Sequence, residues 1–325
     1  MKKITNIIIL ILLILAGFGF LFPNDLRAEY PEKPVSLIAV WPAGGTVDMT
    51  ARALAEAAKK TFPKPIVVVN RPGAAGTIGT AEIIRSKPDG YTIGITGGAV
   101  LTIQPHRTKL PYGSPEEYTP IMNIVNLPVC LAVRVDAPYN TIQEFIAYAK
   151  SNPGKLSIGH SGIGAVVHLD AEIFKQQAKI DVTIAPFQGG PEALAALLGG
   201  HLDALSHHPG LVMPHVKAGK LKVLGVFEEK RNPLFPDTPT FREAGYDIIM
   251  AVYYLIIGPK GMPPKTVSML HDSLKKAMEE PAFRKPLEEG GFEVAYQGPE
   301  EIMKRLKIDY ENSSKLVDQL QLKAK

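Results

Sequence analysis

Glycine-rich turns are the parts of this sequence whose spacing could support chemistry. The first lies in "AVWPAGGTVDMTARALAE", residues 39–56, where an apolar run, a glycine turn and an amphipathic helical pattern follow one another. A helix that begins behind glycines points unpaired backbone N–H groups at whatever occupies the turn. The turn contains no lysine, no metal-ligand cluster and no nucleophile, so the pattern favours binding of an anion over a reaction.

A nucleotide site is disfavoured by the glycine spacing. "WPAGGTVD" lacks the Gly-x4-Gly-Lys-Ser/Thr pattern, so no lysine would reach a phosphate. "GAAGTIG", residues 73–79, has Gly-x2-Gly-x2-Gly spacing instead of the Gly-x-Gly-x2-Gly of dinucleotide sites. Turn formation before a helix explains both runs better, and we predict no cofactor.

Ser161 is the candidate nucleophile of an alternative function. It stands in "GHSGIG" at a strand-to-helix turn, with His160 and His168 close in sequence, and a serine hydrolase needs such a pairing in space. A nucleophile elbow also needs glycine two residues after the serine, where this sequence has Ile163. A serine hydrolase therefore stays as the alternative from another class.

Four of the eight histidines, His201, His207, His208 and His215, lie within one stretch of fifteen residues. Their spacing matches no metal-site pattern, and we predict no metal. Adjacent residues of a strand point to opposite faces. We therefore expect one of His207 and His208 to face a cleft and the other to pack or meet solvent.

His168 and Asp48 each have a structural and a functional interpretation. His168 lies near the start of a helix, where it could pair with Glu172 at i+4 or contact a ligand in the turn before it. Asp48 is suited to accept hydrogen bonds from backbone N–H groups at its own helix start, or to shape the loop that meets ligand.

Strands and helices alternate along the chain, which predicts right-handed βαβ units in mostly parallel, doubly wound sheets. The expected strands are 34–41, 64–70, 91–96, 155–160, 182–187, 202–208 and 221–227, and two closing helices are expected around 267–280 and 300–320. The pattern restarts near Ile121, and "DIIMAVYYLIIGP" returns the chain to the first unit near Ala251. This predicts an α/β fold of two lobes joined by two crossover segments.

The expected first lobe comprises residues 29–125 and 251–325, and the second lobe comprises residues 126–250. Ligands of such sheets bind beyond the carboxyl ends of strands, where the glycine turns lie. We therefore expect the turns of both lobes to face one cleft.

The N-terminus predicts a secretory signal peptide over residues 1–28. Lys2 and Lys3 precede an apolar run over 7–22, and Ala28 is a suitable residue before a cut, which would start the mature chain near Glu29. An uncleaved N-terminal anchor is the alternative. The single cysteine, Cys130, excludes internal disulfides and is expected in the core.

The charge balance argues against a nucleic-acid protein. The net charge is +4, and removal of residues 1–28 takes away three positive charges and one negative charge, which leaves about +2. Basic side chains do not form a stripe interleaved with aromatic residues.

Many motifs together resemble one known family. They include "YPEKPVSLIAVWPAGGTVDMTARALAE", "VVVNRPGAAGTIGTAEI", "KPDGYTIGI", "HLDAEIFK", "GGPEALAALLGGHLDAL", "PDTPTFREAGYD" and "GPKGMPP". The whole mature chain resembles the Bug-type periplasmic receptors of tripartite tricarboxylate transporters. The resemblance implies a two-lobed Venus-flytrap periplasmic-binding-protein fold without enzymatic activity. It also implies capture of a small carboxylate and delivery to a membrane permease by a periplasmic monomer.

The resemblance also implies where the ligand is held. In that family the turns that correspond to residues 42–48 and 162–168 grip one carboxylate, partly through backbone groups. The expected ligand-binding residues are Pro42, Ala43, Gly44, Gly45, Thr46, Val47, Asp48, Thr96, Gly97, Gly98, Thr102, Gly162, Ile163, Gly164, Ala165, His168, Phe187, Gln188, Gly189, Asp203, His207 and Tyr253.

Two departures from the family pattern bear on the ligand. Val47 stands at a usual threonine, and Ala165 stands where the family commonly has serine or threonine. A hydrogen bond to a charged group is worth about 1.5–3 kcal/mol, enough to change ligand preference. We therefore expect a ligand less polar than citrate, such as a monocarboxylate or an aromatic acid. A sensor that presents its ligand to a membrane kinase has the same fold and stays open.

Overall fold

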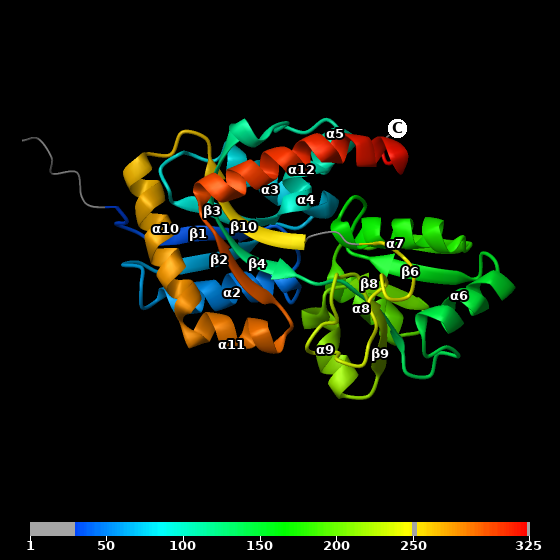
Figure 1. The fold of residues 1–325 in the computed structure, drawn as a ribbon. Helices are drawn as coiled ribbons and strands as arrows, with labels where there is room; N and C mark the ends of the chain where they lie inside the picture. Colours follow the sequence, from blue (N-terminus) through cyan, green and yellow to red (C-terminus); the bar gives the residue numbers. More distant parts are fainter. Residues whose placement is uncertain (1–29, 249–251, 324–325) are drawn as a thin grey trace, which may run out of the picture. The chain divides into compact units, whose positions relative to one another are not determined.

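The computed structural model describes residues 30–248 and 252–323, and the expected signal peptide, residues 1–28, lies outside these ranges. All elements below belong to the unit Lys33–Lys325. Two separate sheets, each with its own helices, organise this unit into two lobes (Figure 1).

The first lobe is built on a six-stranded sheet with the order β11-β4-β10-β3-β1-β2. Its strands are β1 (Val35–Ala39), β2 (Ile66–Asn70), β3 (Thr92–Gly97), β4 (Tyr118–Leu127), β10 (Val252–Pro259) and β11 (Glu293–Gln297). Its helices are α2 (Thr46–Ala58), α3 (Thr77–Arg85), α4 (Gly98–Thr102), α5 (Gln104–Arg107), α10 (Pro264–Glu279), α11 (Pro281–Glu289) and α12 (Pro299–Gln319). Helices α2, α10 and α11 cover one face, and α3, α4 and α12 cover the other (Figure 1).

The second lobe is built on a five-stranded sheet with the order β7-β6-β8-β5-β9. Its strands are β5 (Cys130–Arg134), β6 (Leu156–His160), β7 (Val182–Pro186), β8 (Ala204–His207) and β9 (Leu221–Val226). Its helices are α6 (Ile142–Ser151), α7 (Val166–Ala178), α8 (Gly190–Leu198) and α9 (Pro209–Lys217).

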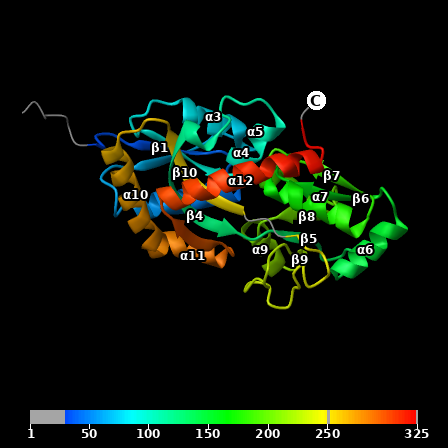
Figure 2. The same ribbon diagram turned by 45° about the horizontal axis from the view of Figure 1, so that its top comes forward.

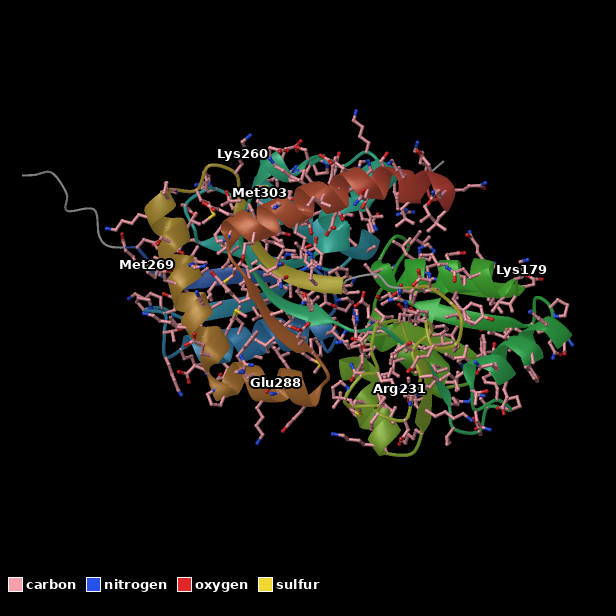
Figure 3. All side chains as sticks on the ribbon, viewed as in Figure 1. Lys179, Arg231, Lys260, Met269, Glu288 and Met303 are labelled. Carbon is pink, nitrogen blue, oxygen red and sulfur yellow. The ribbon has the colours of Figure 1, made fainter. Side chains whose placement is uncertain are left out.

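Hydrophobic periodicity explains why these segments form these elements. The α2 residues Val47, Ala51, Leu54 and Ala58 recur at helical spacing, and all four are buried, as expected. Cys130 is also buried and free, as expected of a core residue. Charged side chains such as Lys179, Arg231 and Glu288 project outward from their elements (Figure 3).

The expectation of mostly parallel sheets is wrong. Among the described strands, four pairs are parallel (β1–β2, β1–β3, β6–β7 and β6–β8). Five pairs are antiparallel, and each of them contains β5, β10 or β11. The two crossovers account for most of this difference. The first crossover runs from the carboxyl end of β4 to β5 of the second sheet, and the second runs from the carboxyl end of β9 to β10 of the first sheet. Both strands therefore enter a sheet at the edge where the neighbouring strands end, and they run antiparallel to those neighbours.

The C-terminal part of the first lobe differs from the sequence expectation in two elements. Helix α11 and the edge strand β11 both form between the two closing helices, and neither was predicted. Pro281 and Pro286 obscured the helical pattern of α11, although proline is well tolerated at the first position of a helix. The long apolar stretch after Ile121 divides at Pro128 into β4 and β5.

Helix α12 lies along the first lobe, and its end approaches α7 of the second lobe (Figure 2). Val317 of α12 packs in one buried cluster with Ile103 and with Leu169 of α7. None of the helices within residues 30–248 and 252–323 is both long enough and apolar enough for a membrane span.

Candidate functional site

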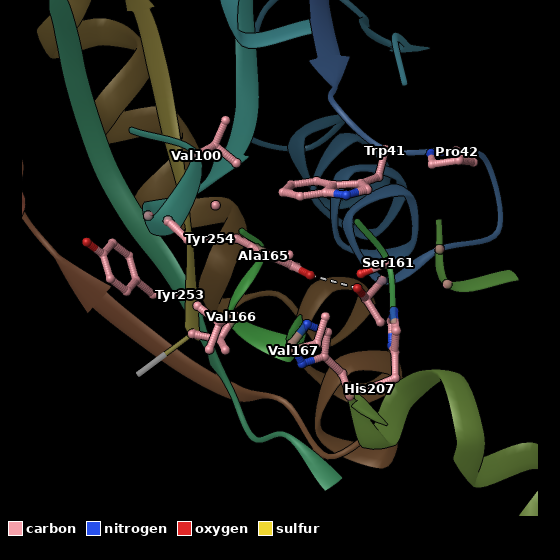
Figure 4. A pocket seen from close by; sticks show the side chains of 18 of the residues that line it. Trp41, Pro42, Val100, Ser161, Ala165, Val166, Val167, His207, Tyr253 and Tyr254 are labelled. Atoms are coloured by element: carbon pink, nitrogen blue, oxygen red, sulfur yellow. Dashed lines mark hydrogen bonds between the residues drawn. The ribbon is translucent and has the colours of Figure 1, made fainter. Parts of the chain in front are cut away.

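A cavity lies where the strand ends of the two sheets meet. It opens beyond the carboxyl ends of β1, β3, β6 and β8 and beside the amino end of β10, and its empty space is about 580 Å³, open solvent at its mouth included. Figure 4 shows Trp41, Val100, Tyr254 and His207 around it. Its lining residues are Trp41, Pro42, Gly45, Thr46, Gly97, Gly98, Ala99, Val100, Ser161, Ala165, Val166, Val167, Gly190, Pro191, His207, His208, Val252, Tyr253 and Tyr254.

Five helices begin at this cavity: α2, α4 and three from the second lobe, α7, α8 and α9. Their N-cap residues are Gly45, Gly97, Ala165, Gly189 and His208, and in none does a side chain cap the helix. Thr141, by contrast, caps α6 away from the cavity by accepting a hydrogen bond from the Glu144 N–H. First-turn N–H groups without a capping side chain can bind an anion. Helices α8 and α9 offer fewer of them, because Pro191 and Pro209 have no N–H group.

Two glycines let neighbouring backbone and rings approach closely. A Cβ atom on Gly98 would lie 2.1 Å from the Tyr253 ring, and one on Gly190 would lie 2.4 Å from His207 Nε2. Any side chain at either position would therefore displace a ring that lines the cavity.

Asp48 holds the first glycine turn from behind. Its carboxylate accepts hydrogen bonds from the Gly44 N–H at 2.9 Å, Arg52 Nε at 2.9 Å and Asn70 Nδ2 at 3.0 Å. Burial alone would raise the pKa of Asp48, but these three hydrogen bonds hold it below its usual value. Of its two expected roles, Asp48 thus shows the one that shapes the glycine turn, and it does not line the cavity.

His160 and His168 hold the second glycine turn. The His168 Nδ1 accepts a hydrogen bond from the Gly164 N–H at 3.1 Å, and His160 Nδ1 lies 3.1 Å from the Gly162 carbonyl. The His168 Nε2 also lies 3.6 Å from Glu172 Oε1, which is the expected i+4 pair. Burial and the neighbouring His168 lower the pKa of His160 to about 3.

His207 and His208 correct the prediction that only one of them faces the cleft. Both are buried and both line the cavity, with ring centroids 5.0 Å apart. Strand β8 ends at His207, and His208 is the N-cap of α9, so strand alternation no longer applies to it. Burial lowers the pKa of both histidines, to about 4 for His208, whose Nδ1 lies 2.9 Å from the Pro128 carbonyl.

The cavity has few polar side-chain atoms. Thr46 Oγ1 and the Tyr254 hydroxyl bind each other at 2.7 Å, the dashed line in Figure 4. The Tyr253 hydroxyl donates to Asp309 at 2.7 Å. Among the described residues, none that lines this cavity has a charged side chain of Lys, Arg, Asp or Glu. Trp41 Nε1 and His207 Nδ1 are buried at the cavity and have no hydrogen-bond partner in the described structure.

The described residues form neither a serine–histidine pair nor a metal-ligand cluster at this cavity. Ser161 lines the cavity, but the hydrogen bonds of the described residues do not join its hydroxyl to a histidine, and His160 Nε2 is without a partner. Within the described ranges, histidine, cysteine and carboxylate side chains do not gather in threes as a metal ion would need.

The structure places the predicted ligand-binding residues in three groups. Eight line the cavity: Pro42, Gly45, Thr46, Gly97, Gly98, Ala165, His207 and Tyr253. Four line a second, adjoining depression instead: Gly162, Ile163, Phe187 and Gln188. Ten line neither: Ala43, Gly44, Val47, Asp48, Thr96, Thr102, Gly164, His168, Gly189 and Asp203.

Residues of the third group lie behind the cavity and support it. Thr96 bonds Thr80 inside the first lobe, and the Asp203 carboxylate accepts from the Ser157 N–H and hydroxyl at the far end of β6. Sequence reasoning missed Trp41, Pro191 and Val252 as lining residues. Other lining residues fell within expected segments without being singled out, namely Val166 and Val167 in the turn 162–168, Ala99 and Val100 in 96–102, Gly190 in 187–190, and Tyr254 beside Tyr253. A usable signal existed for Trp41, the single tryptophan of the chain, which directly precedes the first glycine turn.

Comparison with known proteins agrees with this architecture. Residues 50–322 match the family described as tripartite tricarboxylate transporter family receptor. The periplasmic binding protein BugD is 31% identical with a TM-score of 0.87, over 91% of this chain and 100% of BugD. MatC from Rhodopseudomonas palustris, solved with malate, is 26% identical with a TM-score of 0.82, over 89% of this chain and 100% of its own. Another R. palustris protein, solved with adipate, is 25% identical with a TM-score of 0.85, over 90% of this chain and 99% of its own.

Proposed function

The chain belongs to the tripartite tricarboxylate transporter receptor family, and from this premise we propose that it captures a small carboxylate in the cavity between its lobes. The observation that carries the proposal is the convergence of five uncapped helix starts, from both lobes, on one cavity. Their N–H groups and helix dipoles favour a negatively charged group without a lysine or arginine.

The chemistry of the lining favours an acid of low polarity. Ala165 supplies no hydroxyl group to the lining, and the Thr46 hydroxyl is already bonded to Tyr254. Val100, Val166 and Val252 present apolar surface to the ligand. The relatives solved with malate and adipate hold dicarboxylates. We propose that this receptor prefers an acid less polar than citrate, a monocarboxylate or an aromatic acid.

Two buried atoms fit a polar group on the body of that acid. Trp41 Nε1 is a hydrogen-bond donor that has no partner among the described residues, and His207 Nδ1 is likewise unpaired there. A buried polar group that lacks a partner loses free energy of about 1–3 kcal/mol, so a hydroxyl or carbonyl oxygen of the ligand would be favoured there.

The cellular setting follows from the family. Family members are periplasmic receptors that work with a transporter. We propose export by a signal peptide cut near Ala28, and a non-enzymatic monomer that delivers its ligand to a membrane permease. The lobe boundaries at residues 125–126 and 250–251 belong to the same proposal.

A thermal-shift series tests the ligand class. The purified mature protein is heated with citrate, malate, adipate, benzoate or 4-hydroxybenzoate at equal concentration, and native mass spectrometry weighs any ligand that co-purifies. Benzoate or 4-hydroxybenzoate is expected to raise Tm more than citrate or malate does. Strong stabilisation by citrate and malate alone would reject the low-polarity proposal, and no stabilisation by any carboxylate would reject the carboxylate site.

A matched pair of variants locates the site in the same series. Gly98→Ala would push its Cβ into the Tyr253 ring at the cavity, whereas a Cβ on Gly113 meets only Glu117, at 3.6 Å. Gly98→Ala is expected to abolish the ligand-induced shift and Gly113→Ala to retain it. Equal shifts for the two variants would place the ligand elsewhere.

A further inference from the structure

Three segments far apart in the sequence meet beside the cavity. They are α5 of the first lobe, the turn between β6 and α7 of the second lobe, and the segment that follows α12. The Ile163 carbonyl of the turn accepts hydrogen bonds from Gln104 Nε2 at 2.8 Å and from Arg107 Nη1 at 3.1 Å. Both donors come from α5, so two side chains of one lobe hold one carbonyl of the other.

Arg107 joins all three segments. Its Nη1 also donates to Gln104 Oε1 at 2.8 Å, and its Nε donates to the Leu322 carbonyl at 3.0 Å. The described residues supply Arg107 with no carboxylate partner, so its half-buried guanidinium is satisfied by neutral oxygens. Arginine suits this task because its planar fork presents five N–H donors in fixed directions.

The backbone of the turn is shaped to admit these side chains. Gly164 has φ +78°, and a Cβ there would lie 2.7 Å from both Arg107 Cδ and Gln104 Nε2. Gly162 has φ +118°, and its Cβ would lie 3.0 Å from Ala75 Cβ of the first lobe. Glycine therefore lets the two lobes touch on both sides of Ile163.

An apolar cluster seals the same corner. Ile103 and Leu169 are buried against Val317, with Leu320 and Leu322 packed around them. Ile103 directly precedes α5, and Leu169 belongs to α7. The polar contacts at Ile163 thus lie next to apolar contact between the same two lobes.

We propose that Gln104 and Arg107 are positioning residues that latch the two lobes together over the cavity by holding the Ile163 carbonyl. The cavity-lining residues Ser161 and Ala165 flank Ile163 within the same turn, so the latch also fixes the backbone that faces the ligand. Rotation of the lobes apart must break both hydrogen bonds at once. The latch rests on the proposed cavity function but acts without ligand, and it can therefore be tested without ligand.

The test uses Trp41, the single tryptophan of the chain, which lines the cavity. Acrylamide quenching of its fluorescence reports how open the cavity is in the ligand-free full-length mature protein. Gln104→Glu keeps the size of the side chain and its bond to Arg107 but replaces the donor to Ile163 with an oxygen. Loss of one such bond shifts the open-to-closed ratio by about fivefold, because about 1 kcal/mol is at stake.

Gln104→Glu and Arg107→Lys are both expected to raise the quenching constant and the radius of gyration measured by X-ray scattering. The lysine is expected to have the smaller effect, since one ammonium group still reaches one of the three oxygens. Arg284→Ala, which removes an exposed ion pair with Glu288 on α11, is the matched control and should match the wild type. Quenching and radius unchanged in both latch variants, with Tm unchanged, would overturn the latch whatever ligand the cavity takes.

Discussion

The turn after β1 and the turn after β6 perform the same task with different chemistry. In each, a side chain in the first turn of the following helix accepts a hydrogen bond from a glycine N–H four residues earlier. Asp48 accepts from Gly44 at 2.9 Å, and His168 accepts from Gly164 at 3.1 Å. The first lobe uses an ionised carboxylate for this bond, and the second lobe uses an imidazole.

The carboxylate of the first turn and the imidazole of the second turn require different hydrogen-bond partners. A carboxylate beside an anion site needs compensating donors, which Arg52 and Asn70 supply from within the first lobe. The imidazole of His168 lies beside Glu172 and near His160, at 4.5 Å between ring centroids, in a buried group of histidines. The first turn is therefore fixed by charge inside its own lobe. The second turn depends on the imidazole rings of His160 and His168 and on donors that reach across from α5.

The largest expected effect is that of acidification, which should destabilise the second lobe before the first. Burial sets the folded-state pKa of His160 to about 3 and that of His208 to about 4, below the usual 6.5. Between the folded-state pKa values and 6.5, the unfolded chain therefore binds more protons than the folded chain. The free energy of unfolding is highest above pH 6.5 and falls as the pH drops toward 4. Asp48 has a lowered pKa, so its contribution is lost only below its usual 3.8.

Hydrogen exchange followed by mass spectrometry at pH values from 7 to 4.5 measures this, with Tm recorded alongside. Amides of β6 and β8 should lose protection before those of β1 and α2. His208→Gln keeps a donor for the Pro128 carbonyl without a titrating ring, and it should flatten the Tm profile between pH 4.5 and 6.5. Earlier loss of protection in β1 and α2 would contradict the attribution of the acid sensitivity to the histidines of the second lobe.

Removal of the carboxylate from the first turn is expected to have the next largest effect. Asp48→Ala leaves the Gly44 N–H without its acceptor and removes one of the two acceptors of Asn70 Nδ2, which should cost about 2–3 kcal/mol in the free energy of unfolding. The contribution of Arg52 is small because its side chain is 57% exposed. Urea denaturation at pH 7 measures the loss, and Asp136→Ala, which removes an exposed partner of Arg134, serves as the control. Equal losses for the two variants would mean that Asp48 does not organise its turn.

The smallest expected effect comes from Asp170, a buried carboxylate of the second lobe. Asp170 of α7 is fully buried, and neither carboxylate oxygen has a partner in the described structure, so burial raises its pKa well above the usual value. A raised folded-state pKa gives stability that is present below pH 3.8 and lost as the pH rises. Asp170→Asn should therefore stabilise the protein by about 1 kcal/mol at pH 8. The gain should vanish near pH 4, and destabilisation at pH 8 would refute the argument.

The sequence predicted the elements that local patterns define. The apolar face of α2, the strands that precede glycine turns and the helix starts behind those turns were all predicted from periodicity and glycine placement. The edge strand β11 and helix α11 were not, because β11 is half exposed and α11 contains two prolines. Those weak local patterns are stabilised by packing against β4 and α2, which no short window contains.

The candidate site divides in the same way. Glycines and flanking residues such as Gly45, Gly98 and Ala165 could be named because turns are local. The lining residues Pro191 and Val252 were not named, because their place at the cavity depends on how segments far apart in the chain come together. His207 was predicted to bind ligand. That His208 also lines the cavity depends on the end of β8 at His207, which the sequence did not reveal.

The sequence by itself determined that this chain has helix starts behind glycines and few reactive side chains beside them, because both are set by residues close together in the chain. Only the tertiary structure decided that β5 and β10 run against their neighbours and that five helix starts share one cavity. It also decided that Gln104 and Arg107 reach across to Ile163. Those outcomes depend on contacts between residues dozens of positions apart, and local propensity carries no information about them.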